Sequence, residues 1–119
     1  MMIIRALAVS LVLALIACGG GPTSPSGPPW SQSGVGDSVF TMPSSVDRVH
    51  IVATYAGTGS NFIVWIGPAS QPQSRLLVNV IIGSRYTPAS YDGTVLTGGG
   101  GVTSITNSSG VVWSFTEVR

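Results

Sequence analysis

Apolar side chains recur at every second residue in much of the chain after residue 46. The segment 47–57 reads DRVHIVATYAG, with Val49, Ile51, Ala53 and Tyr55 on one face and Arg48, His50, Val52 and Thr54 on the other. Successive side chains of an extended strand point to opposite sides, whereas a helix repeats about every 3.6 residues. The segment is therefore predicted to be a β-strand with one buried face.

The same period continues in two later parts of the chain. In FIVWIG (62–67), one face carries Phe62, Val64 and Ile66, and the other carries Ile63 and Trp65. Residues 57–61, GTGSN, are turn formers, which predicts an antiparallel hairpin between 48–55 and 62–66. The segment 101–119 is predicted to form a second hairpin, with its turn at 107–110 and with Val111, Trp113 and Phe115 on one face.

Shorter segments complete the predicted fold. SVFTM (38–42), RLLVNVIIG (75–83) and a weak segment at 94–97 bring the number of strands to about seven, with no helix after residue 17. Because 62–66 is apolar on both faces, a single open sheet would leave one of them in water. We therefore expect an all-β domain at residues 30–119, an antiparallel β-sandwich or jelly-roll-like fold.

The order of strand-like segments carries a loose resemblance. The run from Gly36 to Gly67, with LLVNVIIG and the terminal WSFTEVR, is similar in general layout to small secreted β-sandwich modules of the carbohydrate-binding type. No sugar-contact motif matches residue by residue. The resemblance implies a sandwich and makes sugar binding one hypothesis for the domain.

The first seventeen residues have the parts of an export signal. Arg5 precedes an apolar run from Ala6 to Ile16 that only Ser10 interrupts, and the small Ala17 follows. A membrane-spanning helix needs about 20 apolar residues, so this run is too short, and the glycines after Cys18 do not extend it. Residues 1–17 are therefore predicted to be a signal peptide.

The segment Leu15-Ile16-Ala17-Cys18 resembles the lipobox of bacterial lipoproteins. The resemblance implies that a diacylglyceryl group is joined to Cys18, that signal peptidase II cuts between Ala17 and Cys18, and that the new amino group is acylated, commonly by palmitate. Two or three acyl chains give stable membrane binding, whereas one does not. The alternative is an ordinary secretory signal that leaves a free thiol at Cys18.

This resemblance also bears on where the protein is found. Gly19 follows the cysteine where the inner-membrane retention signal of lipoproteins usually has aspartate. We therefore expect a cell-envelope protein, on the outer membrane if the cell has one. Residues 19–29 contain only Gly, Pro, Ser and Thr, so the segment 18–29 is predicted to be a flexible spacer between the lipid and the domain.

The charges of the domain argue against several partners. Residues 30–119 contain four arginines and four carboxylate side chains, and the chain has no lysine. A nucleic-acid partner would require a basic stripe to neutralise phosphates, and none is present. The domain therefore has no electrostatic attraction of its own for nucleic acid or anionic lipid, and membrane contact is expected through Cys18.

The inventory of reactive side chains does not favour catalysis or a resident metal. His50 is the only histidine, and no serine lies in a nucleophile-elbow sequence. The carboxylates available for acid–base chemistry are Asp37, Asp47, Asp92 and Glu117. Asp92 in SYDG offers one oxygen ligand for calcium, but the same tetrapeptide is ordinary turn chemistry, and no zinc ligand set exists. We expect no enzyme, no metal and no cofactor.

The aromatic residues are the better candidates for binding. Trp65 is out of phase with Phe62 and Val64, which predicts an outward-facing indole, and Tyr86 and Tyr91 lie in the loop-rich stretch SRYTPASYDG. Together these three are candidate ligand-binding residues, with Trp65 able to stack on a sugar ring. The alternative is that they pack within the domain. Trp113 is predicted to be core, and Trp30 to fix where the domain begins.

Two hypotheses for function remain. The first is a lipid-anchored protein that displays a non-catalytic sandwich for protein or envelope interaction, through apolar surface or unprotected strand edges. The second is a carbohydrate-binding module that uses exposed aromatic residues. An exposed Trp65 beside polar loop groups would favour a glycan, whereas a bare apolar patch or edge would favour a protein partner.

Overall fold

The computed structural model describes residues 27–84 and 87–119. The predicted signal peptide, Cys18, most of the spacer and Tyr86 lie outside these residues. The described residues form no helix that could cross a bilayer. They contain eight strands: β1 (Ser31–Val35), β2 (Ser38–Met42), β3 (Arg48–Thr54), β4 (Ser60–Gly67), β5 (Arg75–Ile82), β6 (Ser90–Leu96), β7 (Gly101–Thr106) and β8 (Val112–Glu117).

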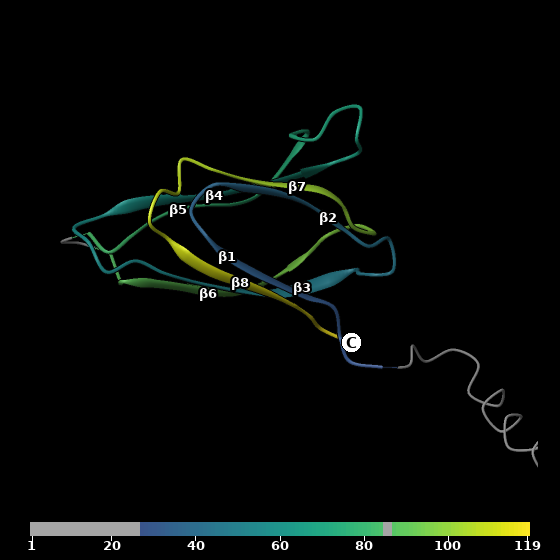
Figure 1. Ribbon diagram of the computed structural model, residues 1–119, viewed down its shortest axis with the longest axis horizontal. Coiled ribbons are helices and arrows are strands. Elements are labelled where there is room, and N and C mark those ends of the chain that lie inside the picture. Colours follow the sequence, from purple (N-terminus) through teal and green to yellow (C-terminus); the bar gives the residue numbers. More distant parts are fainter. Residues whose placement is uncertain (1–26, 85–86) are drawn as a thin grey trace, which may run out of the picture.

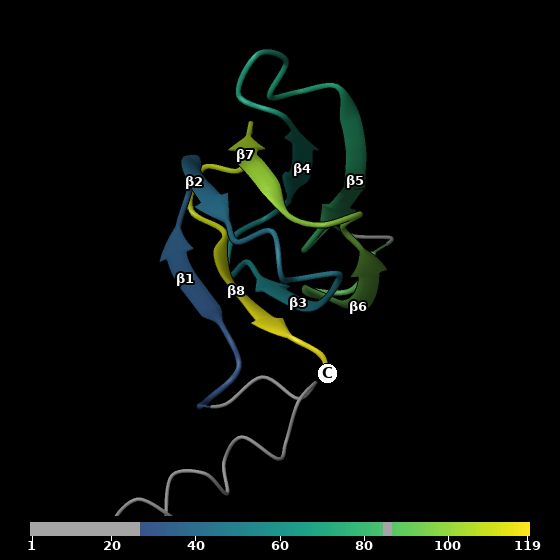
Figure 2. The same cartoon turned by 90° about the vertical axis from the view of Figure 1, so that its right-hand side faces the viewer.

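The strands form two four-stranded antiparallel sheets that pack face to face (Figure 1). Sheet A has the order β1-β8-β3-β6, and sheet B has the order β2-β7-β4-β5. Figure 2 shows the two layers, with sheet B above sheet A. The predicted all-β sandwich is confirmed.

The core lies between the two sheets, and the period of two explains which residues enter it. Val49, Ile51 and Ala53 on β3 and Phe62, Val64 and Ile66 on β4 are all buried. Phe40 of β2 stacks on Trp113 with ring centroids 5.6 Å apart and meets Phe115 edge-on at 5.3 Å. The predicted core position of Trp113 is confirmed, since it is 2 % exposed.

Both predicted hairpins are wrong. β3 and β4 belong to different sheets, and so do β7 and β8, so residues 55–59 and 107–111 carry the chain from one layer to the other. The apolar faces of β3 and β4 enter the same core from opposite sheets, an arrangement that side-by-side pairing in one sheet would not give. Turn-forming residues serve a hairpin and a sheet-to-sheet crossing equally well.

The structure also contains a strand that the sequence did not predict. β1 has the polar sequence SQSGV, but it pairs with β8 through five positions from Ser31↔Thr116 to Val35↔Val112. A Cβ atom at Gly34 would lie 2.7 Å from Cζ2 of Trp113, so the absence of a side chain lets β1 pass over the indole. The Trp113 Nε1 donates to the carbonyl of Gly36 at 2.9 Å and fixes that ring.

Trp30 holds the start of the domain against its end. Its backbone N–H donates to Oε1 of Glu117 at 2.9 Å, and its carbonyl accepts from the Glu117 N–H at 2.8 Å. The guanidinium of Arg119 donates to the carbonyls of Gly27 and Pro28. The predicted role of Trp30 is confirmed, and the chain therefore enters the domain beside its C-terminus, at sheet A (Figure 1).

Candidate functional site

Trp65 lies on the outer face of sheet B, as its phase predicts. The residues on either side of it in β4, Val64 and Ile66, are buried in the core, whereas Ile63 and Trp65 are half-buried on the opposite face. The ladder between β4 and β5 shifts by one residue between Val64 and Trp65, which is a β-bulge. A bulge increases local twist and re-aims the side chain beside it.

A row of side chains crosses all four strands of sheet B at Trp65. Trp65 is opposite Ser104 of β7 and Leu76 of β5, and Ser104 is in turn opposite Val39 of β2. Val39 is 69 % exposed and Leu76 is 42 % exposed. Ser104 shares this face but is 3 % exposed, so the larger side chains on either side enclose it.

The rows beside it extend this apolar surface. Ile63 is opposite Thr106 of β7 and Asn79 of β5, and Ile81 of β5 follows at the end of the sheet. We call this surface the Trp65 face, and it consists of Val39, Ile63, Trp65, Leu76, Asn79, Ile81, Val102, Ser104 and Thr106. None of these residues is charged. Most are aliphatic or aromatic, and the others contribute a few hydroxyl and amide groups.

The indole of Trp65 is oriented by a hydrogen bond. Its Nε1–H donates to the Oγ1 of Thr106 at 3.3 Å, which is a bond between neighbouring strands on the same face. The polar edge of the ring is thereby satisfied within the sheet. What Trp65 offers to a partner is its apolar ring surface.

Tyr91 lies elsewhere in the molecule. It is in β6 of sheet A, opposite Ala53 of β3, and its ring packs on the core with its centroid 6.0 Å from that of Phe62. Burial raises the pKa of its phenol, and the nearby Asp92 carboxylate adds a smaller increase. Tyr91 lies in a strand and not in a loop, and its side chain points toward the core. Trp65 and Tyr91 therefore do not form one platform. Tyr86 is outside the described residues.

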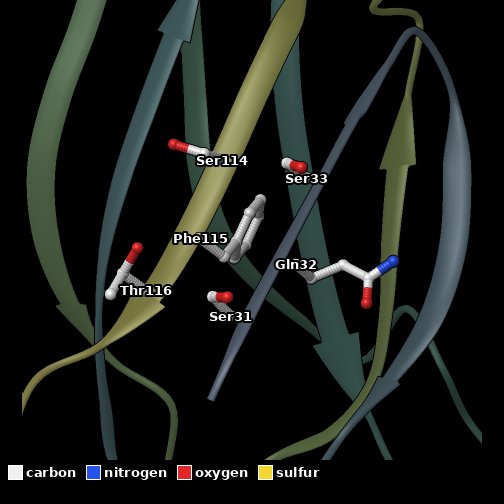
Figure 3. Close-up of a pocket in the computed structure, with 6 residues that line it drawn as sticks. All are labelled: Ser31, Gln32, Ser33, Ser114, Phe115 and Thr116. Carbon is white, nitrogen blue, oxygen red and sulfur yellow. The ribbon is translucent and has the colours of Figure 1, made fainter. Parts of the chain in front are cut away.

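The outer face of sheet A carries hydroxyl groups on β1 and β8, next to the exposed apolar pair Val35 and Val112. Ser31 and Ser33 of β1 are opposite Thr116 and Ser114 of β8, and together they line an open hollow of about 460 Å³ (Figure 3). Gln32 extends away from the hollow, and the ring of Phe115 lies beneath it (Figure 3). Sequence reasoning missed this surface because it missed β1. An alternation of serines with other residues was the signal that could have found it.

His50 and Asp92 stand on the same outer face. Nε2 of His50 lies 2.6 Å from Oδ1 of Asp92, and the two side chains are 41 % and 70 % exposed. His50 is therefore partly exposed and hydrogen-bonded, on the face opposite Val49 and Ile51 that the alternation predicts, and Asp92 lies in a strand and not in a turn. Among the described residues, no serine or threonine hydroxyl bonds to His50, so the pair lacks the nucleophile of a hydrolase triad.

Another hollow is at one end of the sandwich, between the ends of β4 and β5 and the loop 97–100. It measures about 560 Å³ and is lined by Gly67, Arg75 and the glycines 98–101. The Arg75 guanidinium donates to the carbonyls of Leu96 at 3.3 Å and Thr97 at 2.5 Å. These bonds give Arg75 a structural role, since they tie β5 to the end of β6.

The described residues contain no cluster of three or more His, Cys, Asp or Glu side chains that could hold a metal ion. Comparison of the chain with known protein families, with characterised proteins and with solved structures finds no match. The candidate site therefore rests on the geometry alone. Of the three surfaces, the Trp65 face is the one whose side chains come from all four strands of a sheet.

Proposed function

We propose that this protein is a lipid-anchored, non-catalytic protein of the bacterial cell envelope that binds a protein partner through the Trp65 face. The observation that carries the proposal is the uncharged apolar row from Val39 through Trp65 to Leu76 on a surface exposed to solvent. Such a surface is costly to leave in water and is typical of a protein interaction site.

The place at which the chain enters the domain is compatible with binding through the Trp65 face. Residues 27–30 enter at sheet A, and the Trp65 face is on the outside of sheet B, the opposite layer (Figure 2). A lipid on Cys18, which the lipobox resemblance implies, would hold the domain from the side of sheet A. The Trp65 face would then be turned toward partners and away from its own anchor.

Carbohydrate binding is the second candidate. It is favoured by the ring of Trp65, which shares its face of the sheet with the Asn79 amide and the Thr106 hydroxyl, a combination of stacking surface and polar groups that sugar sites use. Against it, the Thr106 hydroxyl already accepts a hydrogen bond from the indole, and the exposed side chains in the same row, Val39 and Leu76, are aliphatic. A protein partner therefore fits the surface better than a glycan.

Cross-linking in living cells tests the interaction. A photoreactive amino acid at position 39 should give an adduct with another envelope protein, and the same substitution at Val112 should not. Val112 is the matched control, since it is an aliphatic residue of similar exposure on the outer face of sheet A. Adding Trp65→Ala should abolish the adduct. Binding of purified cell-wall polysaccharide that Trp65→Ala removes, without a protein adduct, would favour the glycan hypothesis instead.

A separate measurement tests the anchor. Inhibition of signal peptidase II should leave the precursor uncut, and Cys18→Ser should eliminate labelling by palmitate. Normal cleavage of the Cys18→Ser chain to a product of mature size would contradict lipidation. This result would leave the Trp65 face untouched, so the two parts of the proposal are tested independently.

A further inference from the structure

The hydrogen bond of Trp65 determines how its ring lies on sheet B. Trp65 is on β4, and the acceptor, Oγ1 of Thr106, is on the neighbouring strand β7. A threonine hydroxyl is attached directly to Cβ and therefore lies close to the sheet. An indole that stood upright would carry its Nε1 well above this level. The 3.3 Å bond therefore requires the ring to lie low and to lean from β4 toward β7.

Ser104 is the residue of β7 directly opposite Trp65, on the same face of the sheet. Opposite residues of an antiparallel pair have Cβ atoms about 4.5–5.5 Å apart, so their side chains compete for the same space. An indole that leans toward β7 needs the space above position 104. The short side chain of Ser104 leaves that space open, and the residue is only 3 % exposed.

The hydroxyl of Ser104 has no partner in the part of the chain that the structure describes. No described group forms a hydrogen bond with its Oγ, although the residue is buried. Buried polar groups are normally paired, and an unpaired one is unfavourable. The hydroxyl therefore does not fix this part of the sheet. The property of Ser104 that the packing uses is its small size.

We propose that Ser104 is a positioning residue: its small side chain lets the indole of Trp65 lie over β7, so that the partner packs an apolar side chain on the face of the ring. The indole N–H is already bonded to Thr106, so the ring edge has no donor left for the partner. The exposed residues of the same row, Val39 and Leu76, are aliphatic. The electron-rich face of an aromatic ring also disfavours a carboxylate.

This inference rests on the proposed function, because it concerns the surface through which the partner binds. It predicts that the size of residue 104 matters and that its hydroxyl does not. Ser104→Ala removes the hydroxyl and adds no bulk, whereas Ser104→Leu fills the space above β7 and should lift the indole away from Thr106. Ser114→Leu is the matched control, since Ser114 is an outward-facing serine on the second strand of sheet A, as Ser104 is on the second strand of sheet B.

NMR spectroscopy of the full chain in detergent micelles tests the position of the ring without a partner. With isotope-labelled tryptophan, each indole N–H gives its own signal, and Trp65→Phe identifies that of Trp65. Ser104→Ala and Ser114→Leu should leave this signal in place, whereas Ser104→Leu should shift it and speed its hydrogen exchange about tenfold or more. The Trp113 indole, which is bonded to Gly36, should keep its slow exchange and report a folded domain. If Ser104→Leu loses that protection, Ser104→Val is measured in its place.

Photo-cross-linking tests the consequence for the partner. The photoreactive residue is placed at position 76, on the side of Trp65 away from Ser104. Ser104→Ala and Ser114→Leu should keep the adduct, and Ser104→Leu should lower it about tenfold or more. An unchanged indole signal in Ser104→Leu, a displaced indole with an unchanged adduct, or loss of the adduct in Ser104→Ala would each overturn the inference. Absence of any adduct from the chain with Ser104 intact would contradict the proposed function, and the NMR result would still decide the position of the ring.

Discussion

The indole Nε1 of Trp65 donates to the Oγ1 of Thr106 on the neighbouring strand, at 3.3 Å. This bond holds the ring on the outer face of sheet B and satisfies its one polar atom. The ring is therefore fixed before any partner arrives, so little side-chain freedom is lost on binding.

Removal of this bond should weaken partner binding without unfolding the domain. Thr106→Val keeps the shape of the side chain but removes the acceptor, so we expect weaker photo-cross-linking from position 39 and a loss of about 1 kcal/mol in the free energy of unfolding. Urea denaturation measures the second quantity. Thr54→Val, an exposed threonine on the outer face of sheet A, is the control and should change neither. A Thr106→Val chain that binds normally would show that the orientation of the indole is unimportant.

The loop before β7 should tolerate alanine at one glycine and not at the next. Gly99 and Gly100 have positive φ angles of +96° and +75°, so alanine is strained at both, by about 1–2 kcal/mol. A Cβ at Gly100 would also meet the backbone carbonyl oxygens of Met42 and Pro43, whereas at Gly99 the nearest atom is 3.7 Å away. Gly100→Ala should therefore cost about 2 kcal/mol more than Gly99→Ala in urea denaturation. Equal losses would show that the loop moves away freely.

The sequence predicted the faces of the strands better than their partners. Val49, Ile51, Phe62 and Val64 are buried as their alternation requires, and Trp65 is outward for the same reason. The alternation of apolar and polar residues predicts which side of a strand faces the core, but it does not predict which sheet the strand joins. Both predicted hairpins were wrong for this reason, because loops that contain glycine and asparagine can connect two strands of a hairpin or two strands of different sheets.

The candidate site was predictable only in part, and again for a physical reason. Trp65 could be placed because it lies within a long alternating strand. Tyr91 was assigned to a loop because its neighbours include serine, aspartate and glycine, yet pairing with β3 makes this segment a strand and turns the tyrosine inward. The apolar residues Val39 and Leu76 come from two other strands, β2 and β5, and only the register of the ladders places them in the row of Trp65.

The pair of His50 and Asp92 should matter little for stability. Both side chains are well exposed, at 41 % and 70 %, and water competes effectively with such a contact despite the 2.6 Å separation. Asp92→Asn should change the free energy of unfolding at neutral pH by less than about 1 kcal/mol, as is usual for surface ion pairs. Thermal denaturation of this variant beside His50→Gln measures the effect. A loss well above this value in both variants would point to a role that exposure does not explain.

Tyr91 should make the domain sensitive to alkali. Burial, and to a smaller extent Asp92, raises the pKa of its phenol above the usual value of 10.0. Below that pH the phenol is protonated in both the folded and the unfolded chain, and its contribution to stability is complete. As the pH rises further, the unfolded chain loses the proton first, so the free energy of unfolding falls until the pH has passed through the folded-state pKa. Tyr91→Phe should remove this part of the alkaline loss, and Asp92→Asn should reduce it slightly. Urea denaturation from about pH 8 to about 11 measures both effects. If the alkaline slope of Tyr91→Phe equals that of the unaltered protein, Tyr91 does not hold its proton in the way that its place beside Phe62 requires.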